Sequence, residues 1–306
     1  MSRFLFWSDL HCEHAPFEIP TPACQIGATE GAPGRDEIDA ILVAGDTDVR
    51  GAHVDRLLEI WEKWRVPVLA VAGNHEPYGA KRYQKLVSNE GEALADARSR
   101  GADIQVMRQD CRIIGDTRII GATLWTDMLL YPERSEYARQ VIKDEMNDYR
   151  YVRWYDDRRG IYRKMIPEDT VSMHHSDRDY IFDRLDEPFS GKTLVMTHHL
   201  PIRQIMNEDR ARQALTSDAA YASDLWQRIS CRKVDAWISG HSHDCKEASL
   251  TGDHGPVAFI SNPRGYPGEL TRFNPVRILD TSVPLRGSSL DKDEGNEPDH
   301  RNGCQP

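Results

Sequence analysis

The sequence lacks a general positive charge. Its formal net charge is −10 at pH 7, and it contains no basic run with interleaved aromatic residues. Without a positive field that would release counterions, broad and non-specific binding to nucleic acid or to anionic membranes is not expected. A nucleic-acid polymer is therefore disfavoured as a substrate, although a local basic pocket is compatible with this charge balance.

The chain also lacks long apolar runs and paired cysteines. No apolar run approaches the length of a membrane span, and the opening "MSRFLFWSD" has only four consecutive large apolar residues, too few for a signal-peptide core. We therefore expect a cytoplasmic protein with no membrane partner. Its thiols are expected to be reduced, because the six cysteines lie far apart without a CxxC pair: Cys12, Cys24, Cys111, Cys231, Cys245 and Cys304.

What the chain does contain is the pattern of an α/β protein. Its 306 residues suggest one large domain with an insertion or a tail. Residues 3–8 and 38–44 are typical of buried strands, and "VPVLAVAGNHE" is a third apolar strand that ends in a polar loop. Helical spacing of apolar residues predicts helices at about 53–64 and 79–100. The order of strand, loop, helix and strand indicates the α/β class.

The second half of the chain divides into three parts. Short strands are expected at 104–107, 111–114 and 117–122, after which 125–190 is crowded with Arg, Asp and Tyr and predicts a helical, cap-like insertion. Strand-like runs resume in "TLVMTHHLP", "VDAWISGHSHD" and "PVAFISNPRGY", with a helix near 219–229. Residues 281–306 have almost no large apolar side chains and predict a disordered tail, which leaves 1–280 as one domain.

Five apolar strands share one feature: each delivers Asp, Asn or His at its carboxyl end. In open α/β sheets the loops beyond these ends converge and bind ligands, so the pattern predicts one shared site. Each pair alone could be an Asx turn or a helix cap, but five unrelated caps would not all choose such side chains. The segments are "SDLH", "AGDTD", "AGNHE", "MTHH" and "SGHSH".

Carboxylate, imidazole and amide groups together suit borderline divalent metals, with Mn first and Fe, Zn or Ni as alternatives. The donors are too many for one ion, so two are expected. A carboxylate can bridge two cations, and such a pair activates water and grips phosphate oxygens, as phosphoester hydrolysis requires.

The ordered motifs from Asp9 to His243 resemble the calcineurin-like metallophosphoesterases. The resemblance implies a fold of two mixed β-sheets packed as a sandwich and flanked by helices, a four-layer αββα arrangement. It implies one metal held by Asp9, His11, Asp46 and His243, and another by Asp46, Asn74, His198 and His241, with Asp46 bridging. By its position next to Asn74, His75 resembles the family's histidine that protonates the leaving group.

Two positions leave alternatives. Many relatives carry an acidic residue farther along the second motif to orient the catalytic histidine, and here the candidate is Asp48, two positions after Asp46. In "THHLP" either histidine could be the ligand. We favour His198 over His199 because it follows the strand and Thr197 directly.

Four further residues are candidates for holding a substrate phosphate: Arg150, His174, His175 and Arg264. A solvated or ion-paired surface is the alternative interpretation for each.

The sequence therefore predicts a metal-dependent phosphoesterase acting on a small phosphodiester or phosphomonoester, with a nucleotide as one possible substrate. The expected mechanism is attack by a hydroxide that bridges the metals while His75 serves as leaving-group acid. The alternatives are a nuclease and a non-catalytic scaffold on the same fold. Neither the oligomeric state nor the substrate follows from the sequence.

Overall fold

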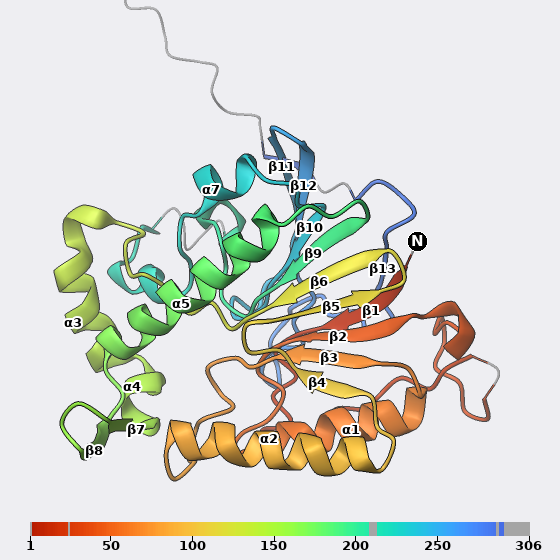
Figure 1. Ribbon diagram of the computed structural model, residues 1–306, viewed down its shortest axis with the longest axis horizontal. Helices are drawn as coiled ribbons and strands as arrows, with labels where there is room; N and C mark the ends of the chain where they lie inside the picture. Colours follow the sequence, from red (N-terminus) through yellow and green to blue (C-terminus); the bar gives the residue numbers. More distant parts are fainter. Residues whose placement is uncertain (1, 24, 208–212, 286–287, 291–306) are drawn as a thin grey trace, which may run out of the picture.

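The computed structural model describes residues 2–23, 25–207, 213–285 and 288–290. Within them two mixed β-sheets pack face to face, with helices on the outer faces, which confirms the expected sandwich (Figure 1). The first sheet has the order β13 (Ile278–Asp280), β1 (Arg3–Trp7), β2 (Ala40–Ala44), β3 (Val68–Val71), β4 (Ile104–Val106). The second has the order β14 (Ser288–Ser289), β11 (Glu247–Gly252), β12 (Gly255–Ile260), β10 (Ala236–Ile238), β9 (Lys192–Met196), β6 (Thr117–Gly121), β5 (Asp110–Ile114).

The alternation of side chains along β1 explains the layers around the first sheet. Leu5 and Trp7 pack in the cluster formed with α1 (His53–Trp64) and α2 (Tyr83–Ser99). Phe4 and Phe6 point the other way, into the core between the two sheets. Successive strand residues face opposite sides, so a strand covered on both faces needs the continuous apolar run seen in the sequence.

Helices also cover the outer face of the second sheet. Phe182 of α5 (Pro167–Asp186) and Ile229 of α7 (Trp226–Ser230) share one buried cluster with Trp237 of β10. In both sheets the strands that precede the histidine- and aspartate-bearing loops are parallel to their neighbours: β1 with β2, β2 with β3, and β9 with β10. Their carboxyl ends therefore meet at one edge of the sandwich.

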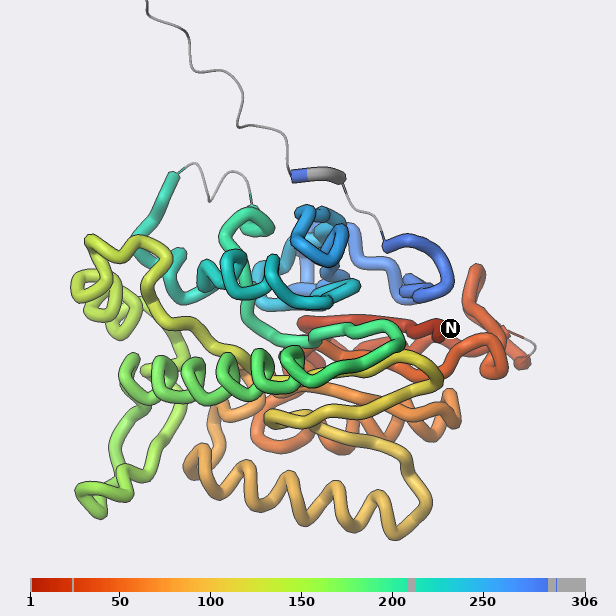
Figure 2. The backbone as a smooth tube through the Cα atoms, turned by 45° about the horizontal axis from the view of Figure 1, so that its top comes forward, coloured from red at the N-terminus to blue at the C-terminus, as the bar shows by residue number. Residues whose placement is uncertain are grey.

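The 125–190 segment contains more than the expected helices. It forms α3 (Ser135–Glu145), α4 (Asn147–Tyr151), α5 and also a hairpin of β7 (Arg153–Asp156) and β8 (Ile161–Lys164). Figures 1 and 2 show α3, α4 and the hairpin at the end of the molecule away from the start of β1, the end toward which β1 and the strands parallel to it run. The hairpin's strands contain no buried residue, so they lack the alternating apolar signal that would have revealed them.

The helix expected near 219–229 is wrong in extent. The chain instead forms a 3₁₀ turn, η4 (Thr216–Ala220), then an isolated bridge between Leu200 and Ala222, and only then the short α7. The strand-like pairing of Ala222 in this bridge is incompatible with a continuous helix through that residue.

The expected tail begins with residues that pack on the domain. Thr281 is buried and exchanges hydrogen bonds with Ser2, and Leu290 donates its N–H to Ser249. Residues 286–287 and 291–306 lie outside the described residues, so disorder there stays a prediction. None of the described helices is long and apolar enough to cross a membrane. In the same part of the chain Cys12, Cys111, Cys231 and Cys245 are free thiols.

Candidate metal centre

Five loops bring the predicted ligands to one place. Asp9 and His11 follow β1, Asp46 follows β2 and Asn74 follows β3. From the other sheet, His198 follows β9, and His241 and His243 follow β10. All of these residues except His243 are buried. The two sheets thus contribute to a single buried cluster at the carboxyl edge.

The backbone of this cluster is held in an uncommon conformation. Asp9, His11, Asp46, His241 and His243 have positive φ angles of 51°, 44°, 54°, 67° and 49°. Such angles are unfavourable for non-glycine residues and gather at functional sites. The loops support one another here, because Asp9 donates its N–H to the carbonyl of Gly45 at 2.9 Å and His11 donates to that of Asp46 at 2.9 Å.

Two glycines allow the loops to approach closely. A Cβ atom at Gly73 would lie 2.1 Å from Oδ1 of Asp46, and one at Gly45, whose φ is +87°, would lie 2.5 Å from Nδ1 of His198. Neither distance is possible for real atoms, so the glycines of "AGDTD" and "AGNHE" are required for the aspartate and histidine to occupy these positions.

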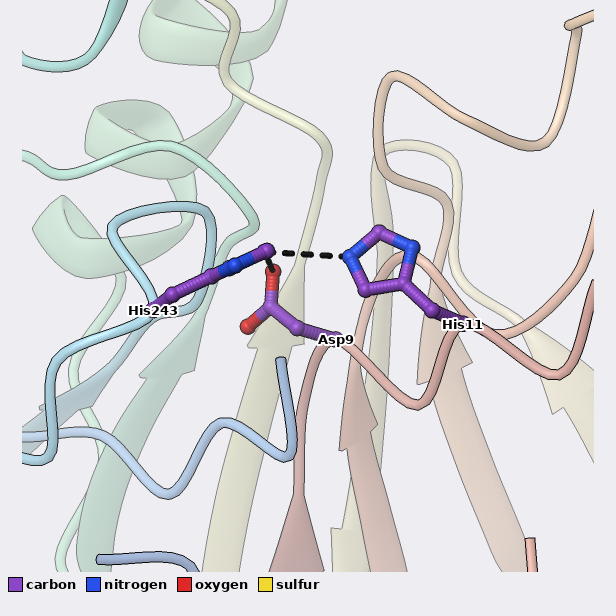
Figure 3. Close-up of side chains that lie close together, drawn as sticks. All are labelled: Asp9, His11 and His243. Atoms are coloured by element: carbon purple, nitrogen blue, oxygen red, sulfur yellow. Dashed lines mark hydrogen bonds and ion pairs between the residues drawn. The ribbon is translucent and has the colours of Figure 1, made fainter. Parts of the chain in front are cut away.

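The first group consists of Asp9, His11 and His243, whose side chains converge in Figure 3. Nε2 of His11 and Nε2 of His243 lie 3.0 Å apart, and Nε2 of His243 is 3.5 Å from Oδ1 of Asp9. The same Asp9 oxygen accepts the backbone N–H of His241 at 2.9 Å, which joins the loops after β1 and β10.

The second group consists of Asp46, His198 and His241. Oδ2 of Asp46 lies 3.3 Å from Nε2 of His198 and 3.8 Å from Nε2 of His11, so one carboxylate faces both groups. Asn74 joins the second group, because its Oδ1 is 2.9 Å from Nε2 of His198.

The donor set fits a pair of cations. Oδ2 of Asp9 and Nε2 of His241 are buried without a hydrogen-bond partner, although unpartnered buried polar atoms are costly. The remote nitrogen Nδ1 of three candidate histidines is already engaged: His11 donates to Glu13, His198 to the carbonyl of Ala44, and His243 to Glu269. An acceptor bonded to Nδ1 fixes the orientation of the ring and leaves Nε2 to face a metal.

The buried carboxylate and imidazole groups of the cluster shift one another's pKa values. Burial disfavours the Asp46 carboxylate, but His198, His75 and His11 around it hold its pKa well below the usual value. Burial likewise disfavours protonation of His198, yet the Asp46 carboxylate raises the pKa of that histidine to about 10. Burial and the neighbouring imidazoles hold the pKa of His241 well below its usual value. The buried carboxylates are therefore stabilised by positive charge nearby, and divalent cations would supply that charge.

His75 lies beside the cluster and is oriented by a residue that the sequence did not reveal. Its Nδ1 donates to Oε1 of Glu13 at 2.8 Å, and the same oxygen accepts from Nδ1 of His11 at 3.0 Å. On the other side of the ring, Nε2 lies 3.1 Å from the hydroxyl of Tyr266. The spacing Asp9-x-His11-x-Glu13 was the one available signal for Glu13.

The expected partnership of Asp48 with His75 is not found. Oδ1 of Asp48 accepts the N–H of Val49, and Oδ2 lies 3.2 Å from Nε of Arg56. The ion pair with α1 draws Asp48 away from the histidine, and Glu13 occupies that position instead.

Of the two histidines in "THHLP", only His198 contacts Asp46 and Asn74. His199 packs its ring on Trp125, with centroids 5.0 Å apart, and its Nδ1 faces the carbonyl of Thr123. His198, the histidine favoured from its position after the strand, is thus the one that lies among the candidate ligands.

Asn74 is also held from behind by residues absent from the sequence-based site. Its Nδ2 donates to Oδ1 of Asp148 at 2.9 Å and lies 3.1 Å from the Tyr78 hydroxyl, which itself donates to Asp148 at 2.6 Å. Both acceptors fix the amide so that Oδ1 faces the cluster. Asp148 belongs to α4, so the 125–190 segment supports a candidate ligand. The sequence around Asp148 carries no motif that would have predicted this role.

The four substrate-binding candidates make other contacts than with a substrate cavity at the candidate ligands. The guanidinium of Arg264 donates to the carbonyls of Leu10, Ala15 and Pro16, and so fixes the loop after β1. His174 is buried and bonds the carbonyl of Leu124, His175 is exposed on α5, and Arg150 bonds the carbonyl of Asp144. None of the four lines the cavity at the candidate ligands.

That cavity has a volume of about 290 Å³ and is lined by Asp46, Asn74, His75, His241 and His243. Met146 and Asn147, at the junction of α3 and α4, also line it. The 125–190 segment therefore forms part of the wall above the candidate ligands.

Residues 2–245 match the family model described as calcineurin-like phosphoesterase, a span that includes all five loops. No curated protein matches the chain.

Two solved structures are similar. A phosphopantetheinyl hydrolase from Mycobacterium tuberculosis superimposes with a TM-score of 0.60 at 16% identity, over 96% of this chain and 98% of that chain. A dimetal phosphatase from Danio rerio has a TM-score of 0.43 at 14% identity, over 85% of this chain and 87% of that chain. At 16% identity, the first likeness supports the fold alone.

Proposed function

We propose that the chain, which belongs to the calcineurin-like phosphoesterase family and is a phosphoester hydrolase, acts on small phosphodiesters or phosphomonoesters. In this proposal the reaction uses two divalent metal ions. One observation carries the proposal: the Asp46 carboxylate faces both His11 and His198, at 3.8 Å and 3.3 Å, between two groups of candidate ligands. A carboxylate placed between two groups of ligands can bridge two cations, and such a pair stabilises the attacking and leaving oxygens of a phosphoester.

We assign the ligands as the resemblance to the family implies. One ion would be held by Asp9, His11, Asp46 and His243, and the other by Asp46, Asn74, His198 and His241. The mixture of imidazole, carboxylate and amide donors suits manganese first, with iron, zinc or nickel as alternatives. Bound there, the ions would supply a water of lowered pKa and would neutralise charge on the phosphate oxygens.

His75 is the proposed acid for the leaving group. Its Nδ1–H is held by Glu13, so the proton at Nε2 faces the cavity and the Tyr266 hydroxyl. Burial opposes protonation of this imidazole, but the Asp46 and Glu13 carboxylates raise its pKa above the usual value. A protonated His75 can thus donate to the departing oxygen, while Glu13 acts as a positioning residue.

The cavity is small and lies under the α3–α4 junction, which favours a compact phosphoester over a polymer. In this proposal the 125–190 segment is a cap that shapes the substrate site. The unpaired thiols of the described cysteines favour the cytoplasm.

The test is hydrolysis of bis-p-nitrophenyl phosphate and of p-nitrophenyl phosphate by protein loaded with manganese, before and after chelation. We expect turnover of at least one substrate, loss on chelation, recovery on adding manganese, and loss of both metals in Asp46→Asn, measured by elemental analysis. Turnover that survives both chelation and Asp46→Asn would overturn the proposal.

A further inference from the structure

A second and larger cavity opens on the side of His75. Its volume is about 740 Å³, and it shares His75, Tyr78, Asn147 and Tyr266 with the cavity at the candidate ligands. Because His75 is the proposed acid, whatever group leaves the phosphorus must lie on this side. The inference drawn below rests on the proposed function.

Aromatic rings form two walls of this cavity. On one side His75 packs on Tyr78, with centroids 4.3 Å apart, and Tyr78 packs on Tyr151, with centroids 5.6 Å apart. On the other side Tyr266 packs on His14, with centroids 5.2 Å apart. Tyr151 is 54% exposed, so a face of this wall is available to a ligand. Such surfaces bind planar rings by stacking.

The cavity also contains a positive charge without a partner. Arg50 lines it and is exposed, and within the described part of the chain no ion pair or hydrogen bond involves its guanidinium. The guanidinium lies against Gly79, where a Cβ atom would come within 2.6 Å of Nε. An unpaired guanidinium beside an aromatic wall is suited to a phosphate or carboxylate group.

We propose that this cavity binds the leaving group, and that the substrate is a phosphoester whose leaving group carries both a planar ring and a second anionic group, as a nucleotide does. In the reaction a water that has lost a proton to the solvent forms a bond to phosphorus through its oxygen, the bond between phosphorus and the leaving oxygen breaks, and His75 gives its proton to the leaving oxygen. The wall formed by Tyr78 and Tyr151 binds the ring, and Arg50 binds the second anion.

The experiment measures hydrolysis of three substrates by the manganese-loaded protein. Each substrate lacks one feature of the one before it. Adenosine 3′,5′-bisphosphate has the ring and the second anion, adenosine 3′-monophosphate has only the ring, and glycerol 3-phosphate has neither. Each compound is supplied with its 3′-phosphate, or 3-phosphate for glycerol, as the monoester and as the methyl diester. Either a phosphomonoesterase or a phosphodiesterase can then act on it. We expect kcat/KM to fall in that order.

Two variants assign the parts of the pocket. Arg50→Met should lower kcat/KM for the bisphosphate about tenfold and leave the monophosphate nearly unchanged, because one charged contact is lost. Tyr151→Ala should lower kcat/KM about tenfold for both nucleotides and not for glycerol phosphate. The matched controls are Arg98→Met on α2 and Tyr137→Ala on α3, exposed residues outside both cavities.

The outcomes separate the two proposals. Equal kcat/KM for the three substrates, or no selective effect of either variant, overturns the leaving-group pocket while turnover of the nitrophenyl esters keeps the proposed function. Failure on every ester, nitrophenyl esters included, overturns both.

Discussion

One oxygen of Glu13 accepts hydrogen bonds from His75 at 2.8 Å and from His11 at 3.0 Å. The carboxylate is partly buried, and although burial opposes its charge, these two histidines lower its pKa to about 2. A single side chain therefore aligns a candidate metal ligand and the proposed acid, and it stays charged across the physiological pH range.

Glu13→Gln should reduce turnover most for esters with poor leaving groups. The amide cannot hold both imidazoles as the carboxylate does, so His75 would be less well aligned to protonate an alkoxide. We expect kcat to fall roughly ten- to a hundredfold for alkyl esters and much less for p-nitrophenyl esters, whose leaving group needs little protonation. The measurement is kcat against the pKa of the leaving group.

The double variant with His75→Ala provides the control for Glu13. Once His75 is absent, Glu13→Gln should add little further loss for alkyl esters. Full additivity of the two losses would show that Glu13 acts mainly through His11.

Asp148→Ala should weaken metal binding without touching a ligand. The Asp148 carboxylate accepts from Nδ2 of Asn74 at 2.9 Å and fixes which way the amide faces. Loss of such a partner typically costs roughly ten- to a hundredfold in metal affinity. Asp148→Asn keeps an acceptor oxygen and should recover most of that loss, as measured by calorimetric titration with manganese. Equal affinity in Asp148→Ala and the parent protein would contradict the assigned role.

Gly73→Ala and Gly91→Ala should have opposite effects. At Gly73 the new Cβ would lie 2.1 Å from Oδ1 of Asp46, so the carboxylate must move and metal content should fall sharply. At Gly91, inside α2, nothing lies within 4 Å of the new atom, and the change should stabilise the fold by about 0.5–1 kcal/mol through helix propensity. Elemental analysis and urea unfolding measure the two effects, and a Gly73→Ala protein with full metal content would refute the first.

The buried Glu90 should make stability depend on acid. Burial opposes its charge, but hydrogen bonds from Arg108 and His53 lower its pKa from 4.5 to about 2. Its contribution is therefore fully present above pH 4.5 and is lost as pH falls toward 2. At about 1.4 kcal/mol per pH unit, it is on the order of 3 kcal/mol.

Urea unfolding of chelator-treated protein between pH 7 and pH 3.5 tests this dependence. Glu90→Gln should be less stable at pH 7 and should lose the part of the slope that appears below pH 4.5. Glu92→Gln, on the exposed face of the same helix, should keep the parent slope. An unchanged slope in Glu90→Gln would assign the acid sensitivity to other groups.

The sequence alone was sufficient for the main elements and for the gathering of the candidate ligands. Buried strands such as β2 are apolar on both faces, and their polar ends are unmistakable in "AGDTD" and "AGNHE". The hairpin of β7 and β8, which has no buried residue, and the break before α7 were missed, because neither carries an apolar periodicity of its own.

By itself the sequence determined which residue types arrive at the carboxyl edge, since each lies within a few positions of its own strand and parallel pairing brings the strand ends together. Tertiary structure decided which side chains touch. It set His198 rather than His199 against Asp46, gave His75 to Glu13 rather than Asp48, and turned Arg264 toward backbone carbonyls. These choices depend on packing between distant elements, because a side chain's partners are fixed by the positions of other loops and not by its neighbours in the chain.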